Sequence, residues 1–156
     1  MGVNIVLIEP EIPQNTGNIA RSCAATGSSL HLVKPLGFSV DDKHLKRAGL
    51  DYWHLLDVHF YDDFEELVKK VGKDKFFYAT TKGGNRHSDM EFFDDCYLVF
   101  GKETRGIPLE ILNKNKDKCI RIPMLNNEKA RSLNLSNSVS IIMYEALRQI
   151  EYPGLI

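Results

Sequence analysis

The sequence predicts an α/β fold in which a mostly parallel sheet of about six strands is flanked by helices. Two observations lead to this prediction. Short apolar runs alternate with segments of helical periodicity, and polar or glycine-rich loops follow several strands, as is typical of the carboxyl edge of a parallel sheet. The 156 residues contain no linker, internal repeat or low-complexity tract, so we expect a single domain spanning residues 1–156.

The N-terminal half opens with a strand at Val3–Ile8, whose nearly continuous apolar run is typical of a strand buried on both faces. Two prolines in residues 9–13 then disfavour both a helix and a strand. Asn15 or Thr16 can cap a short helix, which ends at Gly27. The next predicted elements are a strand at Leu30–Val33, a short basic helix from Asp42 to Gly49, and a strand at Leu55–Phe60.

The C-terminal half begins with a helix capped by Asp62, with Glu65 in the capping-box position. Strands follow at Phe76–Ala79 and Tyr97–Phe100. Pro108 suits the first turn of a short helix that runs to about Asn113. The last two elements are a strand at Cys119–Ile122 and a helix, capped by Asn134 or Ser136, whose apolar face is Val139, Ile142, Met143, Ala146, Leu147 and Ile150.

The composition is that of an ordinary globular protein, with 43% hydrophobic and 26% charged residues. No apolar run approaches the roughly 20 residues of a membrane span, and the N-terminus lacks the features of a secretory signal. We therefore expect a cytoplasmic protein. The three cysteines, Cys23, Cys96 and Cys119, lie far apart without C-x-x-C spacing, so neither a disulfide framework nor a zinc site is predicted.

The net charge of −1 argues against strong nonspecific binding of nucleic acid by one copy of the chain, because that affinity comes mainly from clustered Lys and Arg. Local basic clusters are nevertheless present. They are Lys43, Lys46 and Arg47, then residues 82–87, and Lys129 with Arg131.

The loops at residues 79–84, 101–106 and 123–132 are the polar or glycine-rich ones, and each follows a predicted strand. In parallel α/β folds, ligands bind at this edge of the sheet, so a binding site is predicted where the three loops converge. The sequence has no G-x-G-x-x-G, Walker A or G-x-S-x-G motif, which argues against a common dinucleotide site, an NTPase and an α/β hydrolase. The five histidines lack metal-ligand spacing, so no metal site is predicted.

Three segments in this order resemble the SPOUT class of S-adenosylmethionine-dependent RNA methyltransferases. They are NTGNIAR at 15–21, LVFGKETRGIP at 98–108, and IPM at 122–124 with SLNLSN at 132–137. Within the class, the resemblance is closest to the small single-domain tRNA (cytidine/uridine-2′-O-)-methyltransferases of the wobble position, and it covers essentially the whole chain. It implies a C-terminal trefoil knot, a homodimer, S-adenosylmethionine as cofactor without a metal, and a tRNA anticodon stem-loop as substrate.

The resemblance also implies roles for individual residues. Arg21 is the candidate for activating the ribose 2′-hydroxyl. Because a guanidinium stays protonated at ordinary pH, we expect Arg21 to hold a phosphate or polarise the hydroxyl, and an ion pair with Glu103 is an alternative or additional role. Asn18, Glu103 and Asn137 are expected to orient Arg21 and the ribose. The implied cofactor contacts are Ala79, Thr80, Gly101, Ile122, Met124, Ser132 and Leu133.

The implied RNA-binding residues are Lys43, Lys46, Arg47, Arg131 and Tyr144. Tyr144 lies off the apolar stripe of the last helix, where it would contact a partner subunit or RNA, or would simply be a half-buried aromatic residue. Two other functions stay open. One is 2′-O-methylation at a different RNA position, and the other is a non-catalytic RNA-binding or ribosome-assembly role for the same fold.

Overall fold

The computed structural model describes residues 2–41, 43–44, 47, 50–130 and 132–156. Its centre is a seven-stranded sheet with the order β3-β2-β1-β6-β4-β7-β5, and all the strand pairs are parallel. The strands are β1 (Asn4–Ile8), β2 (Ser29–Val33), β3 (Val58–Tyr61), β4 (Phe76–Ala79), β5 (Asn85–Arg86), β6 (Tyr97–Phe100) and β7 (Cys119–Arg121).

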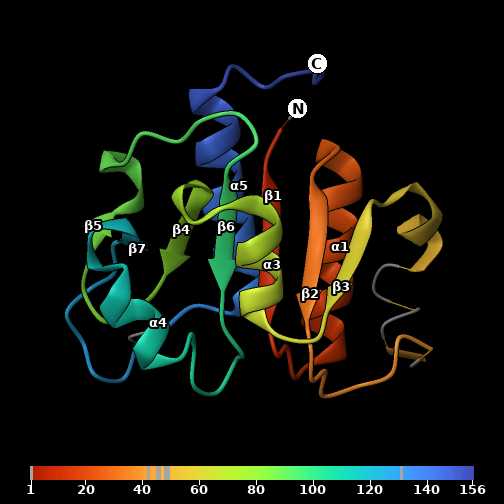
Figure 1. Cartoon of the computed structure of the whole chain (residues 1–156), viewed down its shortest axis with the longest axis horizontal. Helices are drawn as coiled ribbons and strands as arrows, with labels where there is room; N and C mark the ends of the chain where they lie inside the picture. Colours follow the sequence, from red (N-terminus) through yellow and green to blue (C-terminus); the bar gives the residue numbers. More distant parts are fainter. Residues whose placement is uncertain (1, 42, 45–46, 48–49, 131) are drawn as a thin grey trace.

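Helices cover both faces of this sheet. In Figure 1, α3 lies in front of the sheet, whereas α1 and α5 lie behind it. The helices are α1 (Pro13–Thr26), α3 (Phe64–Val71), α4 (Leu109–Lys114) and α5 (Leu135–Gln149), and short 3₁₀ turns occupy Leu50–Leu55, Lys73–Lys75, His87–Asp89 and Lys116–Lys118. This arrangement confirms the predicted α/β class.

The alternation of side chains along the strands builds two apolar layers. On β1, Ile5 and Leu7 face the layer that also contains buried side chains of α1 and α5. Val6 and Ile8 face the other layer, which includes Leu67 of α3 and Leu112 of α4. The central strand is therefore buried on both faces, as its continuous apolar run predicted.

Several predicted boundaries were wrong in the N-terminal half. α1 begins at Pro13 rather than after a cap by Asn15 or Thr16, because proline at the first helical position lacks only an N–H that would have no intrahelical partner. The predicted strand at Leu55–Phe60 instead begins at Val58. The residues before it form a 3₁₀ turn, and the Leu56 N–H donates to the Trp53 carbonyl at 3.1 Å.

The C-terminal half needs smaller corrections. Asp63, not Asp62, caps α3, and its carboxylate accepts from the Glu66 N–H at 2.8 Å, so the capping pair lies one residue later than predicted. Pro108 is the N-cap of α4 rather than part of its first turn, and β7 ends at Arg121. The seventh strand, β5, has only two residues and was too short to predict from an apolar run.

Two predictions, the basic helix and the trefoil knot, are not fully tested by the described residues. The predicted basic helix from Asp42 to Gly49 has both ends outside the described residues, and within it Lys43, His44 and Arg47 are helical. The trefoil knot stays a prediction. In the described parts of the chain, no helix is both long enough and apolar enough to cross a membrane.

Candidate functional site

The three polar loops of the sequence meet at the carboxyl edge of the sheet. β6, β4 and β7 are adjacent in the sheet and parallel, so the loops that follow them emerge side by side. Together with the N-terminal turns of α1 and α5, these loops line a cavity of about 1080 Å³. Its volume is at the upper end of the roughly 300 to 1,000 Å³ that is typical of small-molecule sites.

The seven residues that the sequence assigned to a cofactor all line this cavity. Each of the three loops contributes to the set, and the last loop continues into the N-terminus of α5. Apolar and polar groups alternate around the wall, since Ile122, Met124 and Leu133 lie among hydroxyl-bearing residues. The residues are Ala79, Thr80, Gly101, Ile122, Met124, Ser132 and Leu133.

Gly101 is required by the packing of its own loop. A Cβ atom at this position would lie 1.9 Å from the Gly106 carbonyl carbon and 2.1 Å from the Ile107 nitrogen. The Gly106 N–H donates to the Lys102 carbonyl at 2.8 Å, which closes residues 102–106 into a tight turn. The absence of a side chain at Gly101 therefore lets the turn fold back on itself, in addition to leaving the cavity wall open.

Glu103 links this turn to the start of α1. Its Oε2 atom accepts hydrogen bonds from the backbone N–H groups of Glu11 and Ile12, at 2.8 and 3.0 Å. Neither of these donors is Arg21, which the sequence had suggested as an ion-pair partner. The other oxygen, Oε1, is buried and has no hydrogen-bond partner within the described residues. A buried carboxylate oxygen without a donor is costly, so this atom is suited to accept a bond from a ligand.

Asn18, Arg21 and Asn137 do not line the cavity. Their side chains are exposed on the outward faces of α1 and α5, which pack next to each other behind the sheet (Figure 1). The Ser22 and Ser140 hydroxyls, 3.5 Å apart, join the two helices. The predicted catalytic set is therefore divided, with Glu103 at the cavity and the other three residues on an adjacent surface.

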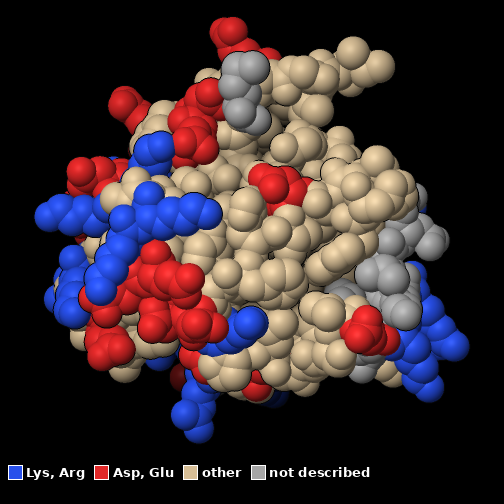
Figure 2. Space-filling model, turned by 45° about the vertical axis from the view of Figure 1, so that its right-hand side comes forward, with Lys and Arg blue, Asp and Glu red and all other residues tan. Residues whose placement is uncertain are grey.

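The predicted RNA-binding residues are only partly described. Lys46 and Arg131 lie outside the described residues, whereas Lys43 and Arg47 are exposed. Tyr144 is 47% exposed and lies on the outward face of α5, with the 40% exposed Ile141 one turn before it. On the side of the molecule shown in Figure 2, basic and acidic side chains are intermixed at the left, and a broad surface with few charged side chains lies between them and the basic side chains at the lower right.

Charged residues also surround the cavity. The cations among its described lining residues are Lys82, Lys102, Arg105 and Arg121. The Lys102 ammonium lies 3.5 Å from a Glu9 carboxylate oxygen, and both side chains are about three-quarters buried. The Arg121 Nε–H donates to the Gly84 carbonyl at 3.3 Å.

Asn15 was expected only as a possible helix cap, although it lines the cavity and is only 6% exposed. Its side-chain oxygen accepts a hydrogen bond at 3.1 Å from the amide nitrogen of Asn134, the N-cap of α5. Asn15 thus connects the first turn of α1 to the first turn of α5. Asn15 is the first residue of the NTGNIAR segment, and this position is the sequence feature that could have identified it as a site residue.

Comparisons with known proteins show the family to which the chain belongs. The model of the SpoU rRNA methylase family matches residues 2–144. A tRNA (cytidine(34)-2′-O)-methyltransferase of Escherichia coli K12 is 49% identical over 155 residues, which cover 99% of this chain and 98% of that protein.

Two solved structures extend the likeness to the fold. A structure described as giving insight into 2′-OH methylation of C/U34 on tRNA has a TM-score of 0.88, is 41% identical, and is matched over 96% of each chain. The SpoU methyltransferase AviRb of Streptomyces viridochromogenes, in complex with the cofactor AdoMet, has a TM-score of 0.84 and 25% identity over 96% of this chain and 58% of that one. The chain therefore belongs to the SpoU family of RNA methylases, in agreement with the resemblance of the three segments at 15–21, 98–108 and 122–137.

Proposed function

We propose that this protein transfers a methyl group from S-adenosylmethionine to the ribose 2′-hydroxyl of the wobble nucleotide, cytidine or uridine, in a tRNA anticodon loop. The observation that carries the proposal is the cavity, because three loops far apart in the sequence bring all seven expected cofactor residues to its wall. The activity named for the Escherichia coli relative and the C/U34 methylation described for a structural neighbour support the choice of substrate.

The cavity lining fits an adenosine-bearing sulfonium. Ile122, Met124 and Leu133 offer an apolar slot for a base, and Thr80 and Ser132 bring polar groups to the same wall. The AdoMet complex of AviRb supports this choice of cofactor. When bound, the cofactor supplies an electrophilic methyl group on positively charged sulfur. The contribution of the chain is to hold the reactants in line and to exclude water.

Methyl transfer to a hydroxyl also requires that its proton be removed. Arg21 keeps its own proton at ordinary pH, so in this proposal it donates to a phosphate or to the hydroxyl oxygen. Asn18 and Asn137 orient Arg21 and the ribose from the same outward surface. Glu103 Oε1, which is buried and has no hydrogen-bond partner among the described residues, accepts a hydrogen bond from a donor that enters the cavity.

We further propose that the active form is a homodimer in which the outward faces of α1 and α5 meet those of a second copy. Exposed Ile141 and Tyr144 supply apolar surface for this contact. The arrangement would bring Arg21 of one copy towards the cavity of the other. Two copies would also double the basic residues, including Lys43 and Arg47, that can contact the phosphates of an anticodon stem.

The experiment that tests the function is methyl transfer from labelled S-adenosylmethionine into bulk tRNA from cells that lack this protein, followed by nuclease digestion and mass mapping. We expect a 2′-O-methyl group on the wobble ribose. We expect Arg21→Ala to transfer methyl groups about 10² to 10³ times more slowly, which is the typical cost of removing one preorganised hydrogen-bond donor at a reacting oxygen, while still binding cofactor and tRNA.

Each other result has a definite meaning. A methyl group at a different nucleotide would keep the enzyme class and replace the substrate. Cofactor binding without incorporation into any RNA, or no cofactor binding at all, would favour the non-catalytic RNA-binding role. Unchanged activity of Arg21→Ala would remove Arg21 from the proposed catalytic set.

A further inference from the structure

Two segments at the edge of the cavity exchange hydrogen bonds in both directions. The Glu103 carboxylate accepts from the backbone of residues 11 and 12, as described above. In return, Glu11 Oε1 accepts from the backbone N–H of Thr104 at 3.0 Å and from the Thr104 hydroxyl at 2.7 Å. Each carboxylate thus satisfies backbone donors of the opposite segment. We call the second half of this exchange, made by Glu11 and Thr104, the Glu11–Thr104 clasp.

Backbone contacts also restrain both partners of the clasp. Thr104 is at the tip of the turn that the Gly106 N–H closes on the Lys102 carbonyl. On the other side, the Gly37 N–H donates to the Pro10 carbonyl at 2.9 Å, and a Cβ atom on Gly37 would lie 2.9 Å from the Glu11 Cα. Each segment is therefore held in place by its own backbone contacts, and the clasp fixes the distance between the start of α1 and the turn at residues 102–106.

The surroundings favour the charged form of Glu11. The Thr104 hydroxyl and N–H lower the pKa of its carboxyl group, and the nearby Lys102 and Arg105 act in the same direction. At neutral pH the clasp is therefore made by a carboxylate, and hydrogen bonds to an ionised acceptor are stronger than those between neutral groups.

The position of the clasp gives it a functional consequence. The turn at 102–106 follows Gly101 at the cavity wall, and residues 11 and 12 lead directly into α1, which carries Asn18 and Arg21. We propose that Glu11 and Thr104 are positioning residues that hold the start of α1 against the cavity loop in the geometry required for methyl transfer. This inference rests on the methyl-transfer function proposed above.

The test is a double-mutant cycle with Glu11→Ala and Thr104→Val, measured as the single-turnover rate of methyl transfer at saturating S-adenosylmethionine and tRNA. We expect each single variant to slow this rate by about tenfold, since small misplacements of reacting groups carry penalties of this size or larger. The double variant should be no slower than Glu11→Ala alone, because Glu11→Ala removes the acceptor of both bonds, whereas Thr104→Val removes only the hydroxyl donor and keeps the backbone N–H. Thr104→Ser, which keeps the hydroxyl, should restore most of the rate.

Other readouts separate positioning from a loss of folding or of cofactor binding. We expect the melting temperature and the dissociation constant for S-adenosylmethionine to change little, because Lys102 and Gly106 still close the turn. The matched control is Glu66→Ala, which removes another exposed carboxylate that accepts a backbone N–H, from Asp62 at 2.8 Å, but does so at α3, away from the cavity. This variant should transfer methyl groups at the wild-type rate.

Amide hydrogen exchange tests the clasp without reference to activity, so it distinguishes failure of this inference from failure of the proposed function. In the wild type, the Thr104 amide should be protected, and it should exchange faster in Glu11→Ala. Rates that multiply in the double variant, a slow rate that Thr104→Ser does not restore, or an unprotected Thr104 amide in the wild type would each overturn the proposal.

Discussion

His31 lies on β2 between two hydrogen-bond partners, Asn4 and Tyr61. The Asn4 amide nitrogen already donates to Asp95 and to the Cys96 carbonyl, so the Asn4 oxygen accepts from His31 Nε2 at 3.1 Å. His31 Nδ1 then accepts from the Tyr61 hydroxyl at 2.9 Å. Both ring nitrogens therefore have a partner in the neutral ring.

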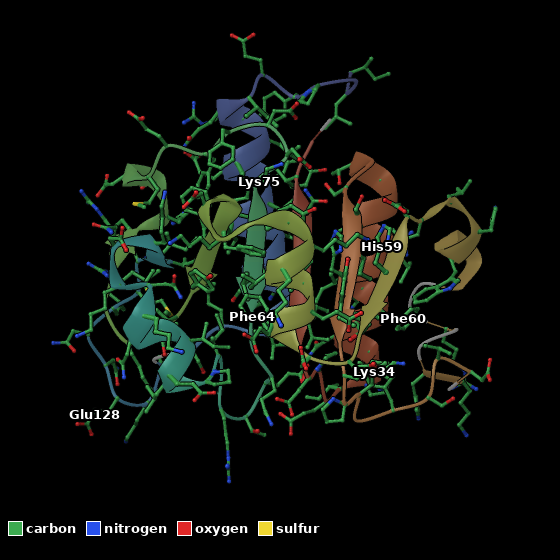
Figure 3. The ribbon with its side chains drawn as sticks, in the orientation of Figure 1. Lys34, His59, Phe60, Phe64, Lys75 and Glu128 are labelled. Atoms are coloured by element: carbon green, nitrogen blue, oxygen red, sulfur yellow. The ribbon has the colours of Figure 1, made fainter. Side chains whose placement is uncertain are left out.

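The environment of His31 lowers its pKa to about 4. Burial is the main cause, and the neighbouring His59 and Lys70 add to it, while Asp57 and Asp95 oppose it. The His59 ring stacks on His31 with 4.9 Å between the ring centroids, and Figure 3 shows His59 on β3 beside β2. In the unfolded chain, where the pKa returns to about 6.5, this histidine would be protonated at mild acidity.

We therefore predict that His31 lowers stability in acid. Between pH 6.5 and 4 the unfolded chain binds a proton that the folded protein does not, so the free energy of unfolding falls as the pH falls, by at most about 3 kcal/mol from this residue. Urea unfolding from pH 7 to 4 measures the effect. The stability difference between the wild type and His31→Gln should shrink towards pH 4. A stability difference that is the same at pH 7 and pH 4 would contradict the prediction.

The sequence predicted some features of the candidate site but not others. The polar loops that follow three strands predicted which edge of the sheet carries the site, because strand direction alone sends these loops to one edge, whereas the seven cavity residues themselves were implied by the family resemblance. The contact between Glu11 and Thr104 could not be predicted, because it joins residues 93 positions apart through side chains that have no periodic pattern. The steric reason for Gly101 depends likewise on the fold of its own loop.

The start of helix α5 is fixed both by a local cap, which the sequence predicted, and by a hydrogen bond to helix α1. The Asn134 side-chain oxygen accepts from the N–H groups of Ser136 at 2.9 Å and Asn137 at 3.4 Å, as the short polar residues before the helix predicted. The Asn134 amide nitrogen in turn donates to Asn15 on α1. One side chain therefore both starts α5 and ties it to the helix that carries Arg21.

Asn134→Ala should lower the free energy of unfolding by about 1 to 2 kcal/mol, because it removes a helix cap and leaves the buried Asn15 oxygen without its donor. Asn134→Ser should lower it less, since serine still caps the helix but does not reproduce the amide donor. Urea unfolding gives both values. Asp63→Ala, which removes only the cap of α3, provides the comparison, and equal losses for Asn134→Ala and Asn134→Ser would show that the cap contributes nothing.

Element boundaries were the least predictable part of the fold. Two prolines suggested an irregular start for residues 9–13, yet Pro13 is the first residue of α1 because its fixed φ also suits a helix. The apolar Leu55 suggested a strand, but its side chain is 67% exposed and its backbone belongs to a 3₁₀ turn. In both places a local residue type is compatible with two conformations, and packing decides between them.

At the scale of the whole molecule, the alternation of strands and helices was enough to predict a parallel α/β sheet, because parallel strands need crossover connections. The order of the strands was not predictable in this way, since β6 enters between β1 and β4. The knot stays a prediction for a related reason. It depends on the path of the chain through its own loops, which no local pattern records.

The proposed homodimer leads to a prediction about shared sites. If Arg21 acts at the cavity of the partner copy, the Arg21→Ala and Glu103→Gln changes of a mixed dimer fall in the same site and leave the other site unaltered. Each variant alone should be nearly inactive. Mixing the two after dissociation and reassembly should restore activity, because a dimer with one copy of each variant contains one intact site, and random pairing makes about half of the dimers mixed.

Mass measurement in solution and a matched pair of surface variants complete this test. The wild type should have twice the chain mass of 17.8 kDa. Tyr144→Asp should shift it towards the single-chain mass and lower its activity, because a charge would be buried in the contact between α5 helices. Phe60→Asp changes a side chain of similar exposure, 41% against 47%, on the edge strand β3, and it should leave the dimer intact (Figure 3). No recovery in the mixed sample, while Tyr144→Asp still dissociates the dimer, would show that Arg21 serves the cavity of its own chain.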